Sequence, residues 1–310
     1  MKIMVTLCLI LWFCTSCSFE DEPGVCPYNV RIEYRYAGAP GSVQLPLYVD
    51  EIHQFVFDTD GVLVGSWLLH RDSLSYWKGQ LPDGHYTVVA WGNRKDGNSR
   101  IIPEPKVGIT NLKELLLSSY QATQRVNTER LYYGSHSLDV GGGNSSYALV
   151  YMTHCHAVLR LTFQWVGEEP PVAATNGGFT VQLRGIPSEY SFGTAYDISL
   201  PDGTGAFTFP DIGGKLMTYK IRAGMNYDSE VNTEVISYRF TSMTHPILSL
   251  YNGTQRIMKE IDLETHFRKL STLMDENTEQ EFDLLIRIEG NKVTVTEISG
   301  TDWDEGGGLG

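Results

Sequence analysis

Histidine and cysteine are the side chains of this sequence that most readily do chemistry, and three of them stand together. His154 and His156 flank Cys155 between two apolar segments. Because side chains alternate between the faces of a strand, we expect both imidazoles on one face and the thiol on the other. Two imidazoles can begin a metal site, but no acidic or histidine partner is near in sequence. We therefore predict packing and hydrogen bonding for this pair, with no metal and no cofactor.

The amino terminus has the features of an export signal that ends at a lipid attachment site. After a short positive start, residues 3–13 are almost wholly apolar, which is too short to cross a bilayer as a helix. Thr15 and Ser16 are small and directly precede Cys17, and this resembles the lipobox of bacterial lipoproteins. The pattern departs from a lipobox at Cys14, where leucine is usual. A plain secretory signal with an incidental cysteine is the alternative.

We accordingly predict a signal peptide over residues 1–16, lipidation of Cys17 and a tether over residues 17–27. The acidic run at residues 20–22 resembles the surface-export signal of some Gram-negative anaerobes, although a solvated acidic linker is the alternative. Together these features predict a lipid-anchored protein of the cell outer membrane that faces the outside of the cell.

Two further cysteines, Cys26 and Cys155, follow the signal region. Export leads to an oxidising compartment, where an even pair of cysteines often forms a disulfide. The chain-entropy model gives about 4–5 kcal/mol for closing a loop of this length. A Cys26–Cys155 disulfide is therefore a candidate, and two buried free thiols are the alternative.

Composition excludes several classes of function. The chain has 310 residues, of which 42% are hydrophobic and 20% charged, as in globular proteins. Its formal net charge of −13 argues against nucleic acid as a partner and against electrostatic docking on an anionic bilayer. Neither a His-Glu-x-x-His motif nor a Gly-x-Ser-x-Gly motif occurs, so we predict no catalytic residues and no enzyme.

The elements that must position these residues read as strands joined by tight turns. Residues 28–36 alternate between apolar and polar, which predicts a half-buried strand. Turn residues separate apolar runs in two predicted hairpins, at Asp58–Gly61 and at Gly290–Asn291. Helices are expected over residues 111–120 and 263–273. The second half adds predicted strands at residues 179–183, 207–209, 215–221 and 234–240.

Short strands at regular spacing predict a mainly β fold, with two Greek-key β-sandwich domains and one or two short helices. We place the domains at residues 28–156 and 157–310, the second with a Gly-rich tail. The change of domain falls somewhere within residues 150–175.

Several segments together resemble the FimB-type anchor subunits of fimbriae, the fimbrillin-A-associated anchor lipoproteins. The most specific is the run Leu81-Pro82-Asp83-Gly84-His85-Tyr86-Thr87-Val88-Val89-Ala90-Trp91-Gly92-Asn93. The others are the lipobox ending at Cys17, Cys26-Pro27, residues 55–57 through Asp60-Gly61, residues 152–157, and residues 293–295 leading to Asp302-Trp303.

The resemblance implies two transthyretin-like sandwiches in tandem and a non-enzymatic role. The protein would anchor and terminate a fimbria at the outer membrane and would join shaft or accessory subunits by β-strand exchange. The edge that takes the exchanged strand cannot be read from the sequence, and we expect Lys292–Trp303 to be a local strand. Because tyrosine and tryptophan are abundant, a surface glycan-binding lipoprotein for nutrient capture or adhesion is the alternative.

Overall fold

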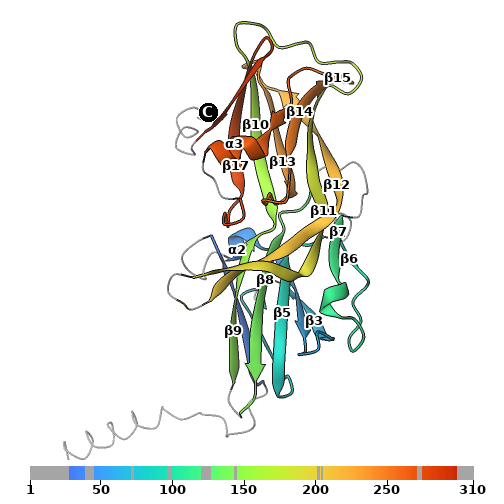
Figure 1. Ribbon diagram of the computed structural model, residues 1–310, viewed down its shortest axis with the longest axis vertical. Coiled ribbons are helices and arrows are strands. Elements are labelled where there is room, and N and C mark those ends of the chain that lie inside the picture. The colour runs from blue at the N-terminus through green and yellow to red at the C-terminus, as the bar shows by residue number, and fades with distance from the viewer. Residues whose placement is uncertain are drawn as a thin grey trace, which may run out of the picture.

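The fold is seen in a computed structural model (Figure 1). The predicted signal peptide, the tether, Cys17 and Cys26 lie outside the residues that the structure describes. Those residues are 28–38, 45–70, 73–95, 99–119, 127–142, 145–200, 203, 205–270 and 274–298.

Strands dominate the described residues, which confirms the predicted mainly β fold with one or two short helices; the Greek-key connection stays a prediction. The first half contains β1 (Val30–Tyr36), α2 (Leu45–Tyr48), β2 (Glu51–Phe57), β3 (Leu63–His70), β4 (Tyr76–Gly79), β5 (Gly84–Gly92), β6 (Ser99–Ile102), the 3-10 turn η3 (Leu112–Glu114), β7 (Leu116–Ser119), β8 (Tyr132–Val140) and β9 (Ser146–His154). The second half contains β10 (His156–Trp165), β11 (Phe179–Ser199), β12 (Ala206–Met225), β13 (Val231–Tyr238), β14 (Ile247–Asn252), β15 (Gln255–Arg256), β16 (Ile261–Asp262), α3 (Leu263–Lys269), β17 (Glu281–Glu289) and β18 (Lys292–Glu297).

The strands form two bodies that follow one another along the long axis of the molecule (Figure 1). The first has the strand order β3-β2-β5-β8-β9-β1-β4, and the second follows the order β15-β14-β11-β12-β13-β10-β17-β18. The chain changes from the first sheet to the second between His154 and His156. The domain limits that we placed at residues 28–156 and 157–310 stay a prediction.

The middle strands of the first body are buried on both faces. In β5, Val88 and Ala90 pack into a core shared with β1, whereas Val89 and Trp91 pack into a core shared with β11. Side chains on opposite faces of one strand alternate, so a strand covered on both sides reads as an unbroken apolar run. The run at residues 88–91 therefore marks the centre of a three-layer body.

The third layer of the first body is formed by β11 and β12, and both strands are much longer than the sequence predicts. β11 and β12 have 21 and 20 residues and pair with each other along most of their length. The predicted strands at residues 179–183, 207–209 and 215–221 are parts of this one pair. The ladder shifts register near Gly185, which has φ +88° and where an added Cβ would lie 2.0 Å from the His245 carbonyl oxygen. Glycine and proline here mark β-bulges, not turns.

The structure confirms one of the two predicted helices and contradicts the other. The helix at residues 263–273 is confirmed over Leu263–Lys269, and the Asp262 carboxylate caps it by accepting from the Thr265 N–H. The predicted helix at residues 111–120 is wrong. Asn111 and Glu114 form a capping box around one 3-10 turn, and the chain then pairs as β7 with β6 and β11. Its leucines suit either a helix or a strand, and pairing with a long neighbouring strand decided the outcome.

Candidate functional sites: entry, junction and distal end

The entry of the chain into the first body is fixed by Asn29. Its side-chain amide donates to the carbonyl of Leu81 at 2.7 Å, and its side-chain oxygen accepts from the Leu81 N–H at 3.0 Å. Its main-chain N–H donates to Gly79, and its main-chain carbonyl accepts from Ser146. Four hydrogen bonds thus hold the residue that directly precedes β1.

β1 continues this attachment as an interior strand. It pairs in parallel with β9 over seven residues and antiparallel with β4 over four. Val30, Ile32, Tyr34 and Tyr36 alternate into the core as predicted, and each is almost completely buried. The Tyr34 hydroxyl donates to Gln54 Oε1, and burial raises the pKa of Tyr34. The entry strand is therefore bound on both edges and on its inner face.

Cys155 lies at the junction of the two bodies, between β9 and β10. It has no exposed surface and forms no disulfide within the described part of the chain, and burial raises the pKa of its thiol. The Tyr190 hydroxyl from β11 donates to the Cys155 carbonyl and accepts from the Arg239 N–H. The candidate Cys26–Cys155 disulfide stays a prediction, because Cys26 lies outside the described residues.

The two junction histidines lie side by side, as the alternation of a strand predicts. The rings of His154 and His156 stack with centroids 4.4 Å apart. His154 Nε2 is 2.8 Å from the Tyr36 hydroxyl, and His156 Nδ1 is 2.8 Å from the Leu131 carbonyl oxygen. Burial lowers the pKa of His156 to about 4, and burial and the charge of neighbouring groups also lower that of His154. Both imidazoles are therefore neutral at physiological pH.

Charged side chains enclose this pair. Glu281 accepts from Arg130 Nη1 at 2.9 Å and from Arg160. Burial raises the pKa of the Glu281 carboxyl, but the hydrogen bond from Arg160 and the charge of Arg130 outweigh burial and hold it below its usual value. Arg239 is completely buried and donates to the carbonyls of residues 154, 274, 275 and 277.

Another histidine, His245, lies near carboxylates at helix α3, but unlike the junction pair it is exposed to solvent. His245 Nδ1 is 2.7 Å from Glu264, and Glu264 also pairs with Arg268. Asp262 accepts from the Thr265 N–H and hydroxyl as the helix cap. The His245 side chain is 61% exposed. This group is engaged in surface ion pairs and helix capping.

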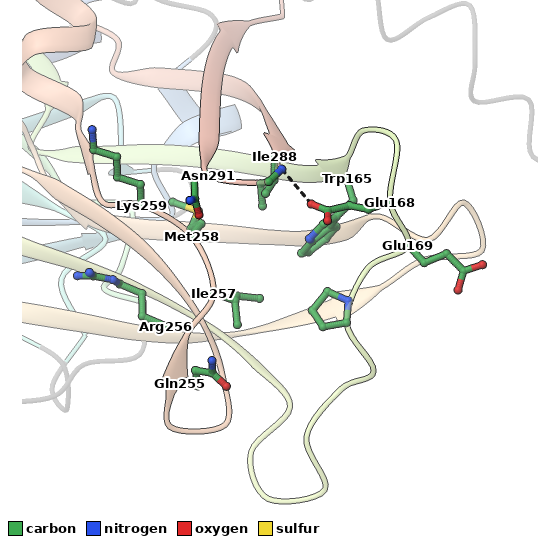
Figure 2. Close-up of a pocket in the computed structure, with 12 residues that line it drawn as sticks. Trp165, Glu168, Glu169, Gln255, Arg256, Ile257, Met258, Lys259, Ile288 and Asn291 are labelled. Carbon is green, nitrogen blue, oxygen red and sulfur yellow. Dashed lines mark hydrogen bonds between the residues drawn. The ribbon is translucent and has the colours of Figure 1, made fainter.

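The end of the second body that lies farthest from Asn29 contains an open groove of about 740 Å³ (Figure 2). Trp165 and Ile288, from neighbouring strands β10 and β17, lie on one side of the groove. The segment Gln255–Lys259 forms the other side. The Gly290 N–H donates to Glu168 Oε1 at 3.1 Å, and this bond joins the turn between β17 and β18 to the loop after β10.

The same end exposes apolar side chains. Val172 is 91% exposed and Tyr227 fully exposed, and Val166 and Met225 are more than one third exposed. Val166 and Val172 belong to the loop that follows β10, Met225 ends β12, and Tyr227 lies in the loop after it. None of the four lines the groove itself, and apolar side chains exposed singly are common on protein surfaces.

β18 offers a free sheet edge beside the groove. It pairs antiparallel with β17 only, among the residues that the structure describes. The Ile298 N–H donates to the Asp283 carbonyl, so that pair is hydrogen-bonded. Because hydrogen-bonded and non-hydrogen-bonded pairs alternate along an antiparallel ladder, the N–H and C=O groups of Val293 and Val295 point away from β17. They are available to a further strand.

The comparisons with known proteins agree with this architecture. The fimbrial anchor protein Mfa2 from Porphyromonas gingivalis has a similar fold, with a TM-score of 0.62, 18% identity, and coverage of 87% of this chain and 96% of that one. A candidate polysaccharide-binding protein from Bacteroides thetaiotaomicron aligns with a TM-score of 0.66 and 13% identity, covering 88% and 98% of the two chains. A candidate adhesin from Bacteroides ovatus aligns at 0.64 and 17%, covering 87% and 93%. A search of curated proteins gave no match.

This mainly β chain of two successive bodies therefore shares its fold with these three solved structures. Residues 22–305 match the family model of the fimbrillin-A associated anchor proteins Mfa1 and Mfa2. The chain therefore belongs to that family, which confirms the resemblance found in the sequence. No described helix has the length and apolar character needed to cross a membrane.

Sequence reasoning missed the partners that lie far along the chain. Glu281 and Arg239 reach His154 and His156 only because β17 and β13 flank β10. The one available signal was the apolar alternation of residues 282–288, which predicted the strand but not its neighbour. The groove was missed for the same reason, since it is lined by three separate segments of the chain, at Trp165–Pro171, Gln255–Lys259 and Ile288–Asn291.

Proposed function

We propose that this chain is the lipid-held base of a fimbria, which it anchors and terminates at the outer membrane without catalysing a reaction. Membership of the anchor family supports a fimbrial role. The observation that supports the proposal is the distance between the entry at Asn29 and the groove, which lie at opposite ends of the molecule. β9 and β10 follow one another for twenty residues, or about 60 Å at the usual rise of a strand. The fixed entry at Asn29 lies at one end of this path and the groove at the other.

The lipid on Cys17 would hold the chain at the membrane. Burying more than one acyl chain gives stable attachment, whereas a single chain is marginal, and bacterial lipoproteins carry several. The net charge of −13 offers no attraction to an anionic bilayer. Attachment would therefore depend on the lipid, and the acidic body would face away from the membrane, outside the cell.

The join to the shaft or to an accessory subunit would form by strand addition at β18. An added strand gains main-chain hydrogen bonds from the outward groups of Val293 and Val295, and pockets for alternate side chains give specificity. The groove lined by Trp165, Ile288 and Asn291, at the turn before β18, offers apolar and polar contacts for a partner. In this arrangement β18 stays a local strand and acts as the acceptor.

Replacing the lipid cysteine tests the proposal directly. In Cys17→Ala we expect the chain and its fimbriae in the culture medium instead of the membrane fraction, measured by immunoblotting and electron microscopy. Cys14→Ala is the matched control, because it removes a neighbouring cysteine of the signal and leaves Cys17 in place. Retention of the Cys17→Ala chain at the membrane would contradict the proposal.

Glycan binding is the second candidate, and the groove is the observation that favours it. Trp165 lies there beside Glu168 and Asn291, and aromatic rings with polar neighbours suit sugars. The candidate polysaccharide-binding protein of similar fold adds weight. If this candidate is correct, the chain binds members of an oligosaccharide panel and Trp165→Ala removes the binding. Absence of binding across a broad oligosaccharide panel would count against this second function.

A further inference from the structure

The junction contains two buried nitrogen atoms that lack hydrogen-bond partners. His154 Nδ1 and His156 Nε2 have none among the described residues. The two side chains are 1% and 0% exposed. A buried polar atom without a partner costs free energy, so an arrangement of two such atoms on stacked rings requires an explanation.

The neighbouring groups determine which atoms carry the hydrogens. The Tyr36 hydroxyl donates its one hydrogen to Glu279 Oε1 at 2.7 Å, so its oxygen must accept from His154 Nε2. The Leu131 carbonyl can only accept, so His156 Nδ1 carries a hydrogen. A neutral imidazole has a single N–H. Both unpartnered atoms, His154 Nδ1 and His156 Nε2, are therefore lone pairs, and neither can donate to the other.

A bound cation or a proton donor would satisfy these two buried lone pairs. The bonds on the opposite nitrogens have the pattern found behind metal-bound histidines, where the second N–H donates to a carbonyl or, here through Tyr36, toward a carboxylate. Glu281 supplies a third group, and one ligand atom from each of His154, His156 and Glu281 lies within 4.8 Å of the other two.

We propose that the junction binds one divalent transition-metal ion through His154, His156 and Glu281. Imidazole nitrogen with one carboxylate oxygen suits zinc, and three protein ligands leave a fourth position for water. The Glu281 side chain is 30% exposed and gives the ion a route of entry. This proposal replaces the sequence-based prediction of no metal, which could not take account of a carboxylate so far along the chain.

The surrounding charges are compatible with a cation. Arg130 and Arg239 place positive charge near the two rings, and Arg160 pairs with Glu281. Four carboxylates offset them, namely Glu279 behind Tyr36, Glu281 between two arginines, and Glu234 and Asp283 at 3.6 Å from Arg160. Glu281 accepts two hydrogen bonds and keeps lone pairs for an ion.

The ion would join the two bodies. His154 ends β9 in the first sheet, whereas His156 and Glu281 begin β10 and β17 in the second. A ligand that binds only the folded state stabilises it by mass action. Zinc is therefore expected to raise the melting temperature of the whole chain in a concentration-dependent way.

The test measures zinc binding to the full chain purified in detergent, after treatment with a chelator, by equilibrium dialysis and elemental analysis. We expect one Zn²⁺ per chain. His154→Gln keeps a donor toward Tyr36, and His156→Asn keeps a donor toward Leu131, but each removes one lone pair. Loss of a group behind a metal ligand weakens binding 10–100-fold, so loss of a ligand should weaken zinc binding at least tenfold.

His245→Gln is the matched control, because it removes the other histidine that lies near carboxylates and should leave binding unchanged. X-ray absorption of the zinc-loaded natural chain gives a readout that needs no variant, and we expect two imidazole nitrogens at about 2.0–2.1 Å. No zinc on the natural chain would overturn the proposal. Equal binding by the histidine variants, loss in His245→Gln, or a sulfur ligand would overturn it too.

Discussion

β1 and β18 are both short strands near an end of the described chain, yet they are attached in different ways. β1 has a neighbour on each edge, and its four inward side chains are almost completely buried. β18 has one neighbour among the described residues, and its inward Val293 and Val295 are only partly buried. Asn29 adds four hydrogen bonds in front of β1, whereas the turn before β18 is exposed.

The difference is compatible with the proposed anchor. In that role β1 would enter beside the membrane and would have to stay paired, and both its edges are paired and its inward side chains are in the core. A strand that receives a partner must keep an edge open, and an open edge carries the risk of unwanted pairing. β18 is short, and Lys292 and Glu297 stand at its two ends; charged residues on an edge strand limit such pairing.

The largest expected effect comes from opening the core beneath β1. Ile32→Ala removes a fully buried side chain and should lower the free energy of unfolding by about 2–5 kcal/mol. Val295→Ala removes a partly buried side chain from β18 and should cost less than about 1.5 kcal/mol, within the usual range for such sites. Urea denaturation of both variants measures the difference. Equal losses would show that the two strands are equally important for folding.

A smaller effect on the free energy of unfolding is expected from removing the side-chain hydrogen bonds of Asn29. Asn29→Ala leaves the buried N–H and C=O of Leu81 without their side-chain partners, which should lower the free energy of unfolding by about 1–3 kcal/mol. Asn291→Ala is the matched control in the exposed distal turn, and surface changes of this kind stay within about 0.5 kcal/mol. If thermal unfolding shifts equally in both variants, the entry is no better fixed than the distal turn.

The same contrast explains what could be predicted from sequence. The alternation of β1 and the turns at Asp58–Gly61 and Gly290–Asn291 are local signals, and the structure confirms both hairpins. Asp58 Oδ1 accepts from the Asp60 and Val62 N–H groups, which is how a short-range turn signal acts. Local chemistry of this kind is complete within a few residues, so one sequence is sufficient to predict it.

Long-range pairing could not be predicted in the same way. Gly185 and Pro210 interrupt β11 and β12 as turn residues would, but the structure uses them at irregularities of one long ladder. The distinction depends on β7 and β14, which pair with β11 from distant parts of the sequence. The ligand group of Glu281 with His154 and His156 also depends on which strands become neighbours, and the residues carry no local sign of that.

The smallest effect on folding, and the sharpest on the proposed function, is expected from Val295→Pro. The Val295 N–H points to the open edge, so proline removes no hydrogen bond to β17 and should destabilise the chain little more than Val295→Ala does. It does remove a donor that an added strand would use. We therefore expect cells with Val295→Pro to keep the chain in the membrane fraction but to shed fimbriae, and cells with Val295→Ala to retain them. Fimbriae counted by electron microscopy, against chain abundance by immunoblot, provide the measurement. Full retention of fimbriae by the proline variant would place the join at another edge and leave β18 as a local strand only.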